Sequence, residues 1–340
     1  MIPSVQAVAD LPFTVERWLL TAPEPWTRYR TLVDLLGRSE SGPEAAAARG
    51  EMLTHPQVRS LLAAASTWGE APFKRHNDAS HPIYALSTLA DFGLRADDPG
   101  MAEVIARVMA RQSPQGAFQS LVNIAPAFGG TGEDQWTWMS CDAPTLLYIL
   151  LAMGLGADER IKRAVDHLLW LATVDGWKCV VAPEVGKFRG PGRKSDPCPI
   201  ATVYALKVLA MLPELCAGAA AHGGTEMLLK HWAAPRGQKY YLFGVGSDFR
   251  KLKHPFVWYD LLHVADVLRR FPFVHADPRF QQMVAAISDQ ADAEGRYTAG
   301  SMYQSWKGWS FADKKNPSPW LTFLAWRIQE NAYHLARTSI

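Results

Sequence analysis

Hydrophobic residues recur along this chain at helical spacing, and one arrangement returns every 55 to 64 residues. Each repeat opens with a proline that leads into a strongly apolar stretch, as in "CPIATVYALKVLAML" at 198–212. Proline suits the first turn of a helix, because its φ is already helical and its missing N–H has no partner there. The pattern predicts apolar inner helices that start near Pro25, Pro82, Pro144, Pro199, Pro255 and Pro319.

A second kind of helix is predicted between the apolar ones. Four clear examples, at 99–112, 157–173, 223–234 and 277–291, mix apolar and charged residues in the way that is typical of a helix with one buried face. Turns with a glycine and an aromatic residue follow them, such as "DGW" at 175–177. Because no segment shows a convincing strand alternation, we expect an all-α chain, with six helix pairs in a closed ring and a single domain over residues 1–340.

Composition and charge restrict the class of protein. The chain has 340 residues, of which 48% are hydrophobic and 20% charged, as in ordinary globular proteins. The net charge of +2 and the lack of a dense basic tract give no reason to expect nucleic acid. The apolar run at 143–157 is shorter than the ~20 residues that span a membrane. With no export signal and only four cysteines, we expect a cytoplasmic protein with free thiols or metal ligands and leave its oligomeric state open.

The repeat resembles the prenyltransferase and squalene-oxidase repeat of the α/α-toroid superfamily. The turns "DGW", "QGAF" (115–118) and "EGRY" (294–297) carry this resemblance, together with the helix starts "CPIATVYALKVL" and "HPFVWYDLLHVADVL". In that superfamily six outer and six inner helices surround a central funnel, and the inner helices begin at the end where chemistry happens. The resemblance therefore implies an (α/α)6 toroid with its site at the starts of the inner helices.

Three metal-binding residue types stand near the starts of two consecutive inner helices. Asp196 and Cys198 precede Pro199, and His254 precedes Pro255. Three protein ligands leave a fourth zinc position open, which is the arrangement of a catalytic zinc ion. Protein prenyltransferase β-subunits, the closest match in motif, bind zinc through an Asp-x-Cys and a later His, so the resemblance implies these three residues as ligands of Zn²⁺. Alternatively, Asp196 caps the helix, Cys198 is a buried apolar side chain, or Cys141 replaces one ligand.

Other residues are candidates for the same funnel. His81, before Pro82, can move a proton near neutral pH, and Asp134 and Tyr259 complete the predicted catalytic set. The chain is rich in aromatic residues, which indicates either packing of long loops or an aromatic-walled cavity. The cavity interpretation predicts that the substrate is bound by Trp136, Trp138, Tyr241, Trp258, Tyr303 and Arg193.

These features favour a zinc-dependent lyase that cleaves a C–C or C–O bond of a small hydrophobic, hydroxylated aromatic substrate. One alternative is a prenyl transferase with a diphosphate substrate, which resembles enzymes that need a second subunit. Another is a toroid that binds a ligand without catalysis. Class II terpene cyclases use an Asp-x-Asp-Asp motif to protonate their substrate, and because the chain has no such run we set that activity aside.

Overall fold

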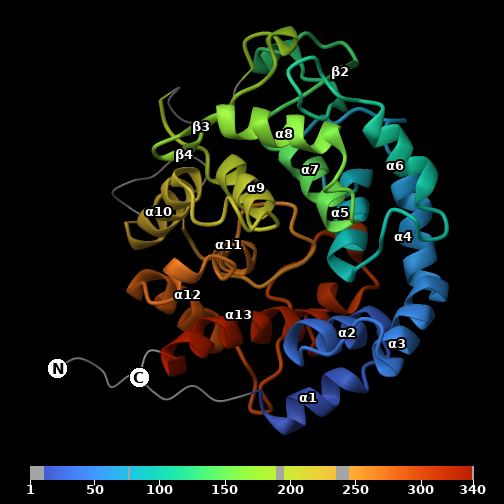
Figure 1. Cartoon of the computed structure of the whole chain (residues 1–340), viewed down its shortest axis with the longest axis vertical. Helices are drawn as coiled ribbons and strands as arrows, with labels where there is room; N and C mark the ends of the chain where they lie inside the picture. The colour runs from blue at the N-terminus through green and yellow to red at the C-terminus, as the bar shows by residue number, and fades with distance from the viewer. Residues whose placement is uncertain (1–10, 76, 189–194, 235–244, 339–340) are drawn as a thin grey trace.

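The computed structural model describes residues 11–75, 77–188, 195–234 and 245–338, and most of them are helical (Figure 1). The α-helices are α1 (Phe13–Leu20), α2 (Pro25–Arg30), α3 (Pro43–Thr54), α4 (Pro56–Ser66), α5 (Pro82–Phe92), α6 (Ala102–Met109), α7 (Ala143–Ala152), α8 (Glu159–Trp170), α9 (Pro199–Leu209), α10 (Ala219–Ala233), α11 (Leu261–Leu268), α12 (Pro278–Ser288) and α13 (Pro319–Thr338). Within these residues, no helix combines the length and apolarity needed to cross a membrane.

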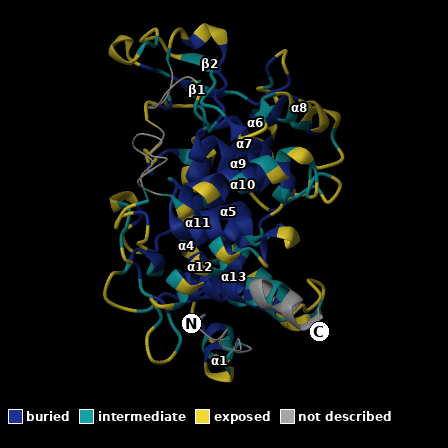
Figure 2. Ribbon diagram, turned by 90° about the vertical axis from the view of Figure 1, so that its left-hand side faces the viewer, coloured by how far each residue is buried: buried dark blue, intermediate teal, exposed yellow. Residues whose placement is uncertain are grey.

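The helices form an inner and an outer set. Every residue of α9 and α11 is buried, and so is all of α5 except its first proline (Figure 2). Contacts run from α5 to α7, α9, α11 and α13 in turn, then to α2 and back to α5. Helices α4, α8, α10 and α12 pack against this inner set with one face each, because their apolar residues fall on one side of the helix.

Most of the inner helices begin where the prolines predict. Helices α2, α5, α9 and α13 start at Pro25, Pro82, Pro199 and Pro319, and α7 starts one residue before Pro144. The preceding residue is extended in α5 and α9 and already helical in α7. In α5 and α7 its side chain accepts a hydrogen bond from a backbone N–H of the first turn.

The predicted helix start at Pro255 is wrong, because α11 begins at Leu261. The Tyr204 hydroxyl donates to the carbonyls of Phe256 and Val257, at 2.9 and 3.1 Å. In a continuous helix those carbonyls would accept backbone N–H groups instead. Asp260 then caps the real start, accepting the backbone N–H of His263 at 3.0 Å.

Short strands, which the sequence pattern did not predict, form two antiparallel pairs. They are β1 (Ser120–Val122) with β2 (Gln135–Thr137), and β3 (Ala172–Thr173) with β4 (Gly176–Trp177). The second pair brackets the "DGW" turn, whose Gly176 and Trp177 form β4. The Thr202 hydroxyl of α9 accepts the backbone N–H of Trp177 at 3.0 Å and so ties this turn to an inner helix.

Candidate active site

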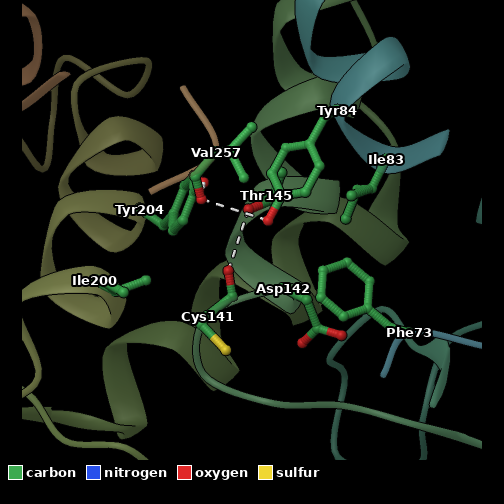
Figure 3. Close-up of a pocket in the computed structure, with 9 residues that line it drawn as sticks. All are labelled: Phe73, Ile83, Tyr84, Cys141, Asp142, Thr145, Ile200, Tyr204 and Val257. Atoms are coloured by element: carbon green, nitrogen blue, oxygen red, sulfur yellow. Dashed lines mark hydrogen bonds between the residues drawn. The ribbon is translucent and has the colours of Figure 1, made fainter. Parts of the chain in front are cut away.

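A small pocket lies where α5, α7 and α9 begin, beside the irregular segment before α11 (Figure 3). Its empty volume is about 260 Å³, including the part open to solvent. The lining is mostly aromatic and aliphatic, with one carboxyl group and one thiol. It consists of Phe73, Ile83, Tyr84, Cys141, Asp142, Thr145, Ile200, Tyr204 and Val257.

Asp142 is the carboxyl group of this pocket, at the N-terminus of α7. Its Oδ1 accepts the backbone N–H groups of Met139 and Ala143, both at 2.9 Å, so the side chain is held in place. Oδ2 is buried and has no hydrogen-bond partner among the described residues. Burial raises the pKa of Asp142 to about 6, although the two N–H groups and the nearby Ser120 hydroxyl, which is outside hydrogen-bonding geometry, lower it. The group can therefore hold or release a proton near neutral pH.

Two tyrosines form the wall across from Asp142. The hydroxyls of Tyr84 and Tyr204 both donate to the Val257 carbonyl, at 3.4 and 3.1 Å. Burial raises the pKa of both phenols, so they stay neutral at physiological pH. With their hydroxyls directed at the backbone, the rings supply aromatic surface to the pocket (Figure 3).

His81, a predicted catalytic residue, lies at the edge of this site. It caps α5 by accepting the backbone N–H of Ile83 on Nδ1, at 3.3 Å. Its ring packs on Phe73, with 4.3 Å between ring centroids. Burial lowers the pKa of His81 to about 4, so the imidazole is neutral at pH 7. His81 thus supports the pocket wall through Phe73 and does not line the pocket itself.

A second buried carboxyl group, Asp260, lies beyond Tyr204. Burial raises the pKa of Asp260 to about 7, against the lowering effect of nearby Lys253. In the described part of the chain, neither Asp260 Oδ2 nor the Tyr303 hydroxyl has a hydrogen-bond partner. Asp260 is close enough to raise the pKa of both Tyr204 and Tyr303. Tyr303 is not part of the pocket lining, and its role in substrate binding stays a prediction.

The predicted zinc ligands do not come together. His254 is fully buried and its ring contacts Phe256, Phe311 and Trp320, with centroids 5.1, 4.8 and 5.7 Å away. Cys198 is also buried, and burial and nearby Cys179 raise the pKa of its thiol to about 12.

The described residues, which include Asp196, contain no group of three or more His, Cys, Asp or Glu side chains that could hold a metal ion. The predicted zinc-dependent lyase is therefore wrong, and so is the transferase that would use the same zinc ion.

The other predicted site residues are spread over the molecule. Asp134 is exposed and accepts the Asn123 side-chain amide at 2.6 Å. Trp136 packs against Trp68, and Trp138 lines a second pocket. Tyr259 packs on Phe249, with centroids 4.7 Å apart.

Of the remaining predictions, Trp258 is partly buried, and its carbonyl lies 3.2 Å from Nδ1 of His263. Tyr241 and Arg193 lie outside the described residues.

Tyr84 and Tyr204 were not among the predicted site residues, and the predicted catalytic set took Asp134 from the loop at 132–144 rather than Asp142. The sequence pattern points to the residue directly before each proline, which is Ala143 in this repeat. Asp142 is one position earlier, because α7 begins before its proline. An N-capping residue two places before each proline was the signal that could have found it.

The sequence matches no protein-family model and no curated protein. Among solved structures, it is similar to the apo type II terpene cyclase MstE from Scytonema, at 12% identity and a TM-score of 0.43, over 95% of this chain and 87% of that one. A substituted MstE from Scytonema, in complex with geranylgeranyl dihydroxybenzoate, is 13% identical with a TM-score of 0.43. That match covers 96% of this chain and 86% of the MstE chain. A protein from Actinoplanes is 12% identical with a TM-score of 0.38, and the match covers 94% of this chain and 88% of that one.

These values are too low to transfer an activity or a substrate to this chain. The enzymes named are cyclases, neither lyases nor transferases. They are terpene cyclases, the enzyme class that we set aside because the chain lacks an Asp-x-Asp-Asp run.

Proposed function

We propose that this chain is an isomerase or cyclase that protonates an apolar, unsaturated small molecule at Asp142. The observation that carries the proposal is a carboxyl group held by two backbone N–H groups, with its second oxygen unpaired within the described residues, in an aromatic-lined pocket. A general acid works best when its pKa lies near the operating pH, and the raised pKa of Asp142, about 6, meets this condition.

The proposed step is a proton transfer to carbon. The Asp142 O–H bond breaks as the electron pair of a C=C bond takes the proton, and a cation forms on the neighbouring carbon. A second C=C bond of the same molecule can add to this cation and close a ring. Loss of a proton from an adjacent carbon then forms a new C=C bond and ends the reaction. The product has the same composition as the substrate, so the reaction needs no co-substrate.

The pocket wall suits such an intermediate. Aromatic faces attract a cation, and Phe73, Tyr84 and Tyr204 present three rings beside Asp142. A ligand that fills the pocket excludes water, which would otherwise add to the cation. The carboxylate left at Asp142 lines the same pocket and is the candidate group that takes back the proton.

We infer further that the helix pairs form an (α/α)6 toroid, supported by the closed circuit of contacts among the inner helices. The pocket would then lie at the funnel end where these helices begin. The space it encloses is about 10 Å³, room for one water molecule, so a long substrate would enter with one end and only as lining side chains move apart. We propose a prenyl chain for that end, because it is apolar and carries branched C=C bonds.

Replacement of Asp142 tests this function. Asp142→Asn keeps an oxygen for the Met139 and Ala143 N–H groups but removes the acidic proton. We expect a rate loss of about 100-fold or more, the usual contribution of a general acid. Geranylgeranyl dihydroxybenzoate and simpler prenylated phenols are incubated with each protein in D₂O, and mass spectrometry detects cyclised products that have gained one deuterium.

Asp134→Asn is the matched control, because that carboxylate is exposed and contacts Asn123 in a loop. This variant should react at the wild-type rate, and circular dichroism should show both variants folded. Wild-type turnover by Asp142→Asn would overturn the proposal. So would a wild-type protein that incorporates no deuterium into any of these compounds.

A further inference from the structure

A second pocket lies on the other side of the first turn of α7, between α7 and α8. Asp142 and Thr145 line the first pocket, whereas Ala143 and Leu147 line the second. Because a helix turns by 100° per residue, the two pairs lie on nearly opposite sides of α7. The second pocket has an empty volume of about 290 Å³ including its open part, but the space it encloses is only about 10 Å³, so a ring enters only as lining side chains move apart. Its lining is almost entirely apolar, so it would favour an apolar ligand.

Two polar atoms in this apolar lining are unsatisfied. Trp138 Nε1 and His167 Nε2 are both buried and have no hydrogen-bond partner among the residues described. The two rings meet edge to face, with centroids 4.5 Å apart. The His167 residue is only 6% exposed. Buried polar groups without a partner are unfavourable, so a ligand that pairs with them gains affinity.

From these contacts we propose that the second pocket binds a small aromatic alcohol, with its ring among the apolar side chains and its hydroxyl between Trp138 and His167. A hydroxyl oxygen can accept the Trp138 N–H. The same hydroxyl can donate to His167 Nε2, or accept from it in the other tautomer, so it fits the imidazole in either neutral form. Trp170, which is 76% exposed, lies 6.0 Å from the His167 ring and marks the solvent side of the site. This proposal does not depend on the activity at Asp142.

Phenol and toluene are the probes, because they differ only in whether the ring carries a hydroxyl or a methyl group. Each is titrated into the full-length protein, and binding is followed by isothermal calorimetry and by NMR. His167→Phe keeps a buried ring and removes Nε2. We expect it to weaken phenol binding about tenfold and to leave toluene binding within twofold. Trp138→Phe should give the same selective loss, and it serves if His167→Phe does not fold.

Thr145→Val is the matched control in the first pocket, where the Thr145 hydroxyl donates to the Cys141 carbonyl at 3.2 Å. It should leave phenol affinity within twofold. The proposal is overturned if wild-type protein binds no phenol, if the folded variants weaken phenol and toluene equally or not at all, or if Thr145→Val removes phenol binding. An isomerase assay plays no part in this test, so its result stands whatever the first pocket does.

Discussion

Burial sets the protonation of single residues around the centre of this molecule. Removal from water disfavours the charged form, so it raises the pKa of Asp142 and Asp260 and lowers the pKa of His254 and His263. The carboxyl groups thereby become proton donors and acceptors near neutral pH. The two histidines become neutral, ring-shaped packing groups.

His263 should make the stability of the protein depend on pH. It is fully buried and stacks on Phe256, and the pKa of its imidazole falls to about 3, below the usual 6.5. Below pH 6.5 the unfolded chain binds a proton that the folded chain does not. The contribution of neutral His263 is therefore complete above pH 6.5 and is lost as the pH falls toward 3.

His263→Phe should remove this dependence. Between pH 6 and pH 4, the free energy of unfolding of the variant should fall less steeply with pH than that of the wild type. The two slopes should differ by about 1.4 kcal/mol per pH unit. Urea titrations at pH 7, 6, 5 and 4 measure the slope. His222→Phe, at an exposed position of α10, is the control and should keep the wild-type slope. An unchanged slope in His263→Phe would show that this imidazole is protonated in the folded protein.

At the scale of the elements, the turns between outer and inner helices depend on glycine. Gly176, in the "DGW" turn, has a φ of 89°, a conformation that residues with a Cβ atom rarely adopt. A Cβ atom there would lie 2.8 Å from Thr202 Oγ1, the hydroxyl that holds Trp177 against α9. The turn and the inner helix therefore fit together only without a side chain at this position.

Gly176→Ala should lower the free energy of unfolding by about 1–2 kcal/mol, since it combines left-handed backbone strain with a close contact. Gly50→Ala is the matched control. Gly50 lies inside α3 with no atom within 4 Å of an added Cβ, so alanine there should stabilise the protein by about 0.5–1 kcal/mol. Chemical denaturation measures both. Equal effects of the two changes would contradict this account of the turn.

At the scale of the whole molecule, ion pairs join helices that are distant in sequence. Asp266 of α11 is fully buried and accepts Arg269 at 2.9 Å, Arg270 at 3.3 Å and Arg327 of α13 at 2.6 Å. Arg327 also contacts Asp34, which follows α2, at 3.3 Å. This network therefore links the last inner helices to the first, where the circuit of contacts closes.

Asp266→Asn should lower the free energy of unfolding by about 3–5 kcal/mol, because it leaves buried arginines without their shared carboxylate. Glu159→Gln is the control. Its carboxylate pairs with Lys162 on the exposed face of α8, and such a pair contributes less than about 1 kcal/mol. Thermal and urea unfolding compare the two. A loss below 1 kcal/mol in Asp266→Asn would mean that the network does not hold the two ends of the circuit together.

Local signals along the chain are enough to place most of the helices. Helical periodicity, the helix-opening prolines and the glycine turns are local signals, since each depends on residues within a few positions of one another. They placed α2, α5, α9 and α13 at their prolines. They failed at α11, where the Tyr204 hydroxyl occupies the carbonyls that an earlier helix start would need.

Which side chains share a site depends instead on how the whole chain packs. Asp142 differs from the exposed Asp134, eight residues earlier, because it is buried against Tyr84 and Tyr204, which come from other helices. The Asp196, Cys198 and His254 pattern looked like a zinc site, yet its members are not brought together. Burial and distance between segments depend on how all the helices pack, and no local pattern of residue types records them.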